Sequence, residues 1–286
     1  MKKFDYYQPE TLKEAYGLME KHGGDARYIA GGTDIIWRIK QGVIQADALI
    51  SLRRIAALGG IAVNGALTLG SMALFRDIER DSAIAEGYPS LTHAVSILAN
   101  PQVRNIATVG GNLCNGAPSA DCAPPLMVME AILTIEGPGG KREVPIGDFF
   151  TGPGETCMDK TEVLTQVKVP QMGPDSGSMF LKKGRVSQDI SIVNAAASLS
   201  MDGKVCRKCR LAVGSVAPVP LRLPGVEAMV EGQEIDQELL DRVVEMVEDA
   251  VSPITDVRST EEYRRAMSGV LVKRAIKGVH EAVCRS

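Results

Sequence analysis

The amino-acid sequence predicts an α+β fold, and three features predict it. Apolar and charged residues make up 45% and 23% of the chain, the proportions of an ordinary globular protein. The first 170 or so residues mix short strand-like runs with helical runs. Near the C-terminus, three strand-like runs precede two helical runs, an order typical of α+β domains, at 178–183, 190–201, 205–216, 236–251 and 259–283.

The first unit, residues 1–55, is predicted to be a small α/β lobe. Its clearest element is a helix over 11–22, because Thr11 and Glu14 form a capping box. Apolar residues then recur at helical spacing, namely Leu12, Ala15, Tyr16 and Met19. Short strands and one short helix complete the lobe, at 27–30, 48–52 and 35–40.

The second unit, residues 56–172, alternates strands with helices. Strands are predicted at 61–64, 67–70, 132–135 and 162–169, and helices at 73–80 and 90–99. The Gly-Pro-Gly-Gly run at 137–140 is a strong turn signal. Residues 100–121 are rich in Gly, Asn and Pro, and this segment is too long and too specific in composition to be a simple connection.

The third unit, residues 178–286, follows a Gly-Pro-Asp-Ser-Gly-Ser linker at 173–178. Asp202-Gly203, between its last two strands, is a dipeptide typical of tight hairpin turns. Ser259 and Glu262 have capping-box spacing and are predicted to open the last helix. Three strands followed by two helices make this unit an α+β domain.

Composition excludes several classes of partner. Lys and Arg number 32 against 35 Asp and Glu, so the net charge of −3 offers no polybasic surface for nucleic acid or membrane. No apolar stretch approaches the roughly 18 residues of a transmembrane helix, and the N-terminus lacks the apolar core of a signal peptide. Six cysteines are too sparse for a disulfide scaffold. We therefore expect a cytoplasmic protein with reduced thiols.

Two glycine clusters are candidate binding loops. Loop 1 is Ile-Ala-Gly-Gly-Thr-Asp at 29–34, and loop 2 is Thr-Val-Gly-Gly-Asn at 108–112, followed by a polar run that ends at Asp121. A Gly-Gly pair lets backbone N–H groups approach an anion, so two such loops can hold a diphosphate from both sides. Each is also consistent with a simple tight turn. Neither matches G-x-G-x-x-G or the P-loop pattern, which disfavours a Rossmann nucleotide domain.

The two loops and their surroundings resemble a known family. Ala-Gly-Gly-Thr-Asp at 30–34 and PQVRNIATVGGNLCNGAPSAD at 101–121 are similar to the FAD-binding subunits of the molybdenum hydroxylases, which include xanthine, carbon monoxide and nicotinate dehydrogenases. CNGAPSAD at 114–121 most resembles the bacterial xanthine dehydrogenase type. The resemblance extends to REVPIGDFFTGPG at 142–154 and covers essentially the whole chain. It implies a two-lobed FAD-binding domain of the PCMH type, like vanillyl-alcohol oxidase, followed by a smaller α+β C-terminal domain.

The resemblance also implies which residues bind FAD. Loop 1 would contact the diphosphate through backbone amides, loop 2 would hold it from the other side, and Asp121 would bind a sugar or ribityl hydroxyl. Leu98 would lie near the cofactor, and Cys157 and Met158 near the flavin ring. The predicted set is Ile29, Ala30, Gly31, Gly32, Thr33, Asp34, Leu98, Ala107, Thr108, Gly110, Gly111, Asn112, Asp121, Cys157, Met158 and Lys182.

Lys182 is implied to stabilise the negative charge of reduced flavin at its N1–C2=O edge. Its spacing to Asp189 is one residue shorter than the family pattern, so Lys183 stays an alternative.

The resemblance further implies an electron-transfer subunit. Substrate would be oxidised at a molybdenum cofactor in a large subunit, and electrons would pass through the [2Fe-2S] centres of a small subunit to FAD, then to NAD+ or another acceptor. A carbon monoxide or nicotinate dehydrogenase complex is the first alternative, and a non-redox nucleotide-binding scaffold is the second.

No catalytic residue and no metal site is predicted in this chain itself. Cys206 and Cys209 form a C-x-x-C pair, but a tetrahedral metal site needs four ligands and no second pair accompanies them. Arg104 is interpreted as a structural anchor of loop 2, and Trp37 as a residue that packs between lobes. The basic run 204–210 is interpreted as a solvated strand face that could meet a partner subunit.

Overall fold

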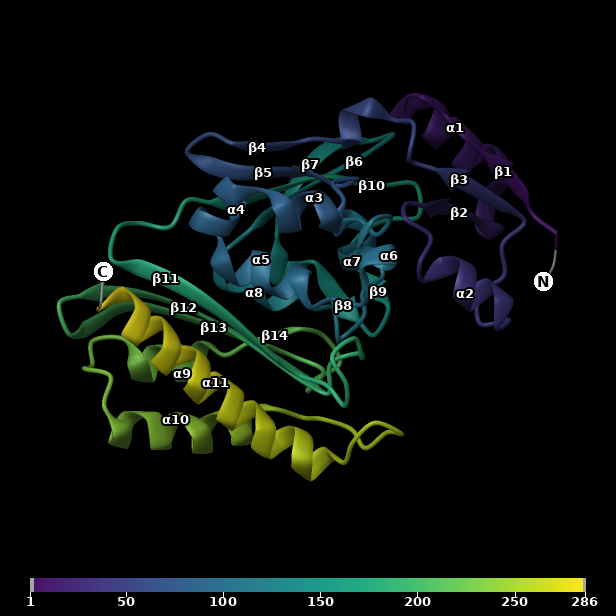
Figure 1. The fold of residues 1–286 in the computed structure, drawn as a ribbon. Helices are drawn as coiled ribbons and strands as arrows, with labels where there is room; N and C mark the ends of the chain where they lie inside the picture. Colours follow the sequence, from purple (N-terminus) through teal and green to yellow (C-terminus); the bar gives the residue numbers. More distant parts are fainter. Residues whose placement is uncertain (1–2, 285–286) are drawn as a thin grey trace.

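The computed structural model describes residues 3–284, which form two lobes and a C-terminal domain (Figure 1). Lobe 1 contains β1 (Asp5–Tyr7), α1 (Leu12–His22), η1 (Gly23–Asp25), β2 (Ala26–Ile29), α2 (Ile35–Lys40), β3 (Ala48–Ser51) and η2 (Ala56–Leu58). Its three strands form a parallel sheet in the order β1-β3-β2. As predicted, Thr11 caps α1, because its hydroxyl accepts a hydrogen bond from the Glu14 N–H.

Lobe 2 is built on a five-stranded antiparallel sheet in the order β4-β5-β10-β6-β7. Its elements are β4 (Ile61–Val63), β5 (Ala66–Gly70), α3 (Phe75–Arg80), α4 (Ser82–Gly87), α5 (Pro89–Ser96), α6 (Pro101–Arg104), α7 (Val109–Cys114), α8 (Ala123–Val128), β6 (Ile132–Gly137), β7 (Gly140–Pro145), η3 (Ile146–Asp148), β8 (Phe150–Gly152), β9 (Glu155–Thr156) and β10 (Val163–Pro170). Gly137 pairs with Gly140, which confirms the predicted turn. The lobe has one apolar core, and α7 carries loop 2.

The C-terminal domain has a four-stranded antiparallel sheet in the order β11-β12-β13-β14, with α9 and α11 packed on it and α10 packed on these two helices. Its elements are β11 (Ser176–Lys183), β12 (Val193–Asp202), β13 (Val205–Gly214), β14 (Leu221–Arg222), α9 (Pro224–Val230), α10 (Gln237–Ala250) and α11 (Glu261–Val283). Asp202 pairs with Val205 across the predicted hairpin. The capping-box assignment at Ser259 is wrong by one residue: Thr260 caps α11, with its hydroxyl accepting from the Tyr263 N–H, so the helix starts later.

Both faces of the C-terminal sheet are buried. Phe180, Ala196 and Ala212 belong to the core of lobe 2, whereas their strand neighbours Ala195 and Leu211 belong to the core under α9, α10 and α11. Successive side chains of a strand point to opposite faces, so the sheet joins the two cores. This packing fixes β11 against lobe 2 and makes it a wall of the site described below.

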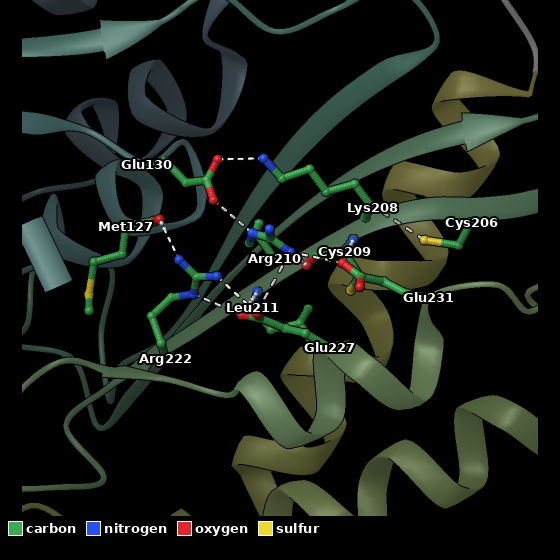
Figure 2. A network of polar contacts seen from close by, with 10 residues as sticks. All are labelled: Met127, Glu130, Cys206, Lys208, Cys209, Arg210, Leu211, Arg222, Glu227 and Glu231. Carbon is green, nitrogen blue, oxygen red and sulfur yellow. Dashed lines mark hydrogen bonds and ion pairs between the residues drawn. The ribbon is translucent and has the colours of Figure 1, made fainter. Parts of the chain in front are cut away.

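Charged side chains also bridge the two parts (Figure 2). Glu130, just after α8, accepts hydrogen bonds from Lys208 and Arg210 of β13, and Arg222 of β14 donates to the Met127 carbonyl of α8. The interpretation of 204–210 as a solvated face holds for Lys204, Arg207 and Lys208, which are exposed, and is wrong for Arg210, whose side chain is largely covered and pairs with Glu130. No helix among residues 3–284 is long and apolar enough to cross a membrane.

Candidate functional site

A cavity of about 640 Å³ lies where the two lobes and the C-terminal domain meet. Residues of loop 1 and loop 2 line it, together with Lys182 and the segment 188–190. Its volume falls within the range of roughly 300–1,000 Å³ that is usual for cofactor and ligand pockets. The two loops, nearly 80 residues apart in the sequence, thus face one space.

The glycines of both loops permit backbone to pack on backbone. A Cβ atom on Gly31 would lie 2.2 Å from the Ile106 carbonyl oxygen, and one on Gly110 would lie 2.6 Å from the Ser71 carbonyl oxygen. Gly32 has a φ of +80°, a conformation that side chains disfavour. Loop 1 therefore sits directly against the segment that leads into loop 2, and a side chain at Gly31 would push these two apart, whereas one at Gly110 would push loop 2 away from Ser71.

The two loops differ in the hydrogen-bond donors they offer. In loop 2 the backbone N–H groups of Gly110, Gly111 and Asn112 donate to Ser71 O, Thr108 Oγ1 and Thr108 O. In loop 1, no hydrogen bond within residues 3–284 engages the N–H groups of residues 31–34. Free backbone donors suit an anion. Loop 1 can therefore bind an anion through its backbone N–H groups, whereas loop 2 can contact a ligand through the side chains of Thr108 and Asn112.

Unpartnered polar atoms in the cavity wall fit a polar ligand. Ser71 Oγ and Asn112 Oδ1 are buried without a hydrogen-bond partner in the described part of the chain, and both residues line the cavity. Such atoms are costly unless something satisfies them. Together with the free amides of loop 1 and the cavity volume, they fit a bound dinucleotide such as FAD.

At another part of the wall, Lys182 forms a buried ion pair with Asp121. Lys182 Nζ lies 2.6 Å from Asp121 Oδ2, and the two side chains are 6% and 7% exposed. Lys183 is exposed and does not line the cavity. Of the two lysines, Lys182 therefore lines the cavity and Lys183 does not. Burial raises the pKa of the neighbouring Cys122 thiol, which disfavours its reactive thiolate form.

Arg104 is the structural anchor that the sequence predicts. Its guanidinium contacts both carboxylate oxygens of Glu79, at 3.1 and 3.2 Å, and donates to the carbonyls of Leu98 and Ala99 at 3.0 and 3.2 Å. Ala99 has a φ of +45°, and these bonds hold it there. Leu98 and Ala99 line the cavity. Although burial raises the pKa of Glu79, hydrogen bonds from Arg76 and Arg104 bring it below the ordinary value.

Replacing Arg104 with leucine is expected to destabilise the protein by about 3 kcal/mol, because Glu79 would lose its buried partner. Since the folded-state pKa of Glu79 is lowered, the pair contributes stability above the ordinary pKa of 4.5 and loses it as the pH falls below that value. Urea unfolding of both proteins from pH 7 down to about pH 3 measures this, because the loss occurs between 4.5 and the lower folded-state pKa of Glu79. A stability gap that stays constant over the whole range would contradict the assignment.

All but one of the predicted FAD-binding residues line the cavity, and the exception is Cys157. The Cys157 carbonyl accepts from Arg142 at 2.9 Å, and its N–H donates to Phe149 O at 2.8 Å. Met158, its neighbour, does line the cavity.

The expectation that Trp37 packs between lobes is wrong, because its side chain is 59% exposed.

Sequence reasoning missed several residues of the wall. They include Ser71, Ser119, Glu162, Gln188 and Ile190, which come from four different segments. Ser119 lies inside the polar run that follows loop 2 and ends at Asp121, so its place in that run could have predicted a position in the cavity wall. Ser71 follows an ordinary strand, and nothing in its local sequence distinguishes it.

Two family models match the chain. One is described as the FAD binding domain in molybdopterin dehydrogenase and matches residues 2–172. The other is described as the CO dehydrogenase flavoprotein C-terminal domain and matches residues 178–279. Together they span nearly the whole chain.

Individual relatives agree with these models. The chain is 34% identical to the xanthine dehydrogenase FAD-binding subunit of Escherichia coli O157:H7, over 95% of this chain and 94% of the other. It is 30% identical to the carbon monoxide dehydrogenase medium chain of Hydrogenophaga pseudoflava, over 96% of both. A solved structure of carbon monoxide dehydrogenase from that organism superposes with a TM-score of 0.96 at 30% identity, covering 99% of both chains.

Proposed function

We propose that this chain, which belongs to the family of FAD-binding medium subunits of the molybdenum hydroxylases, uses FAD in the cavity to pass electrons on to NAD+. It is an oxidoreductase subunit and a flavoprotein. The partners we propose are a large subunit with a molybdenum cofactor and a small subunit with [2Fe-2S] centres. We favour a xanthine dehydrogenase-like complex, which the 34% identity to the xanthine dehydrogenase subunit supports.

The observation that carries the assignment of the cavity is the pairing of free amides with a buried lysine. The N–H groups of residues 31–34 lack acceptors in the described chain and would hold an anionic diphosphate. Lys182 supplies positive charge in the same cavity, which favours a reduced, anionic flavin. When bound, FAD supplies the exchange between one-electron and two-electron transfer.

The test is made on the full chain, purified with the subunits that accompany it. We expect a flavin absorption spectrum and release of FAD by acid. After anaerobic reduction, addition of NAD+ is expected to restore the oxidised spectrum and to yield NADH. A colourless protein that does not bind added FAD would contradict the cavity assignment. Reoxidation by quinones but not by NAD+ would overturn the choice of acceptor alone.

A further inference from the structure

We propose that Ser191 and Asn194 are positioning residues which set, through Asp121, the positive charge that Lys182 presents to the cofactor. The proposal rests on the function proposed for the cavity. Sequence reasoning identified neither residue, and neither lines the cavity. Both residues donate hydrogen bonds to the carboxylate of Asp121, which also contacts Lys182.

The two carboxylate oxygens of Asp121 have different partners. Asp121 Oδ1 accepts from Ser191 Oγ at 2.5 Å and from Asn194 Nδ2 at 2.8 Å, which leaves Oδ2 for Lys182. Ser191 and Asn194 are 2% and 0% exposed. The Ser191 backbone is itself held, because its carbonyl accepts from Ser215 Oγ at 3.0 Å. The carboxylate therefore has a single orientation, fixed by buried donors.

The network joins lobe 2 to the C-terminal domain. Asp121 lies between α7 and α8, Lys182 lies on β11, and Asn194 lies on β12. Gly214 of β13 leaves room for the Asn194 side chain, since a Cβ atom on Gly214 would lie 2.3 Å from Asn194 Oδ1. The charge beside the cofactor is thus controlled by residues of the other domain.

Electrostatics gives the network a definite effect on the cofactor. Hydrogen bonds from Ser191 and Asn194 disperse the negative charge of Asp121, so the ion pair leaves a net positive field on the cavity side. Asp121 is the one hydrogen-bond partner of Lys182 Nζ within residues 3–284, and an ammonium carries three N–H donors. Two donors therefore remain for a ligand. Without the Ser191 hydroxyl, Asp121 would cancel more of the lysine charge.

The readout is the ratio of the Kd for oxidised FAD to the Kd for reduced FAD, measured anaerobically on the full chain with its accompanying subunits. Ser191→Ala is expected to lower this ratio by about tenfold, the factor for one hydrogen bond to a charged group. Lys182→Met is expected to lower the ratio further, and Asp121→Asn to raise it. Ser191→Thr, which keeps the hydroxyl, is expected to restore most of the wild-type ratio.

Ser178→Ala is the matched control. The Ser178 hydroxyl donates to Ser90 Oγ at 2.8 Å, also across the boundary between the C-terminal domain and lobe 2, but neither residue lines the cavity. We expect its ratio to equal that of the wild type. If Ser191→Ala leaves the ratio unchanged, or if Ser178→Ala lowers it equally, the proposal is overturned. A wild-type chain that binds no FAD would instead contradict the proposed function.

Discussion

Replacing Gly31 with alanine is expected to weaken the binding of FAD strongly, by up to about 150-fold. The added Cβ would lie 2.2 Å from Ile106 O and 2.9 Å from Ala107 Cα, and backbone atoms cannot rotate away as a side chain does. Loop 1 must then withdraw from the segment that leads into loop 2. The free N–H groups of residues 31–34 would move with loop 1, so they would no longer face the diphosphate site opposite loop 2.

The expected loss of affinity follows from the cost of overpacking. Inserting a methyl group into a well-packed site costs about 1–3 kcal/mol, which corresponds to roughly 5- to 150-fold weaker binding. The measurement is the FAD content of the purified protein, followed by titration of the apoprotein with FAD. Gly24→Ala is the control, because a Cβ on Gly24 meets nothing within 4 Å. A Gly31→Ala protein that binds FAD as tightly as the Gly24→Ala protein would refute the loop geometry.

Elements with a strong local signal were predictable. Helix α1 has a cap, an apolar stripe and a glycine stop, and the β12–β13 hairpin has its turn dipeptide. Helix α8 was missed because Pro124 and Pro125 suggest a break in the sequence. In the structure these prolines stand in the first turn, where a missing N–H costs nothing. Strand β1 was missed because three residues carry too little pattern.

The site was predictable where one segment carries it and unpredictable where packing assembles it. The positions of the two loops followed from their glycines, but the sequence did not reveal that the loop 2 amides donate within the chain. For Gly110 that outcome depends on Ser71, which comes from another segment, whereas Gly111 and Asn112 donate to Thr108 of the same loop. Strand parity could have separated Lys182 from Lys183, because Phe180 faces the core of lobe 2 and side chains two residues apart share a face.

The second large effect is expected at Glu227, which holds the interface in Figure 2 together. Its carboxylate is buried, accepts from the Leu211 N–H at 2.9 Å and binds Arg222 through two hydrogen bonds of 2.8 Å. Arg222 in turn donates to Met127 O of lobe 2. Glu227→Ala would leave a partly buried guanidinium and a buried N–H without their acceptor, which costs about 3–5 kcal/mol when a buried pair is broken.

Because Glu227 orients Arg222, which donates to Met127 O of lobe 2, the loss of Glu227 is expected to loosen FAD as well as the fold. Urea unfolding and the rate of FAD dissociation measure the two effects. Glu227→Gln keeps the shape and one acceptor oxygen, so it is expected to lose less stability than Glu227→Ala. Glu245→Ala, at an exposed position of α10, is the control and is expected to change neither quantity. If Glu227→Ala lowered stability but left FAD dissociation at the wild-type rate, the C-terminal domain would hold its own fold through Glu227 without transmitting that order to the cofactor site.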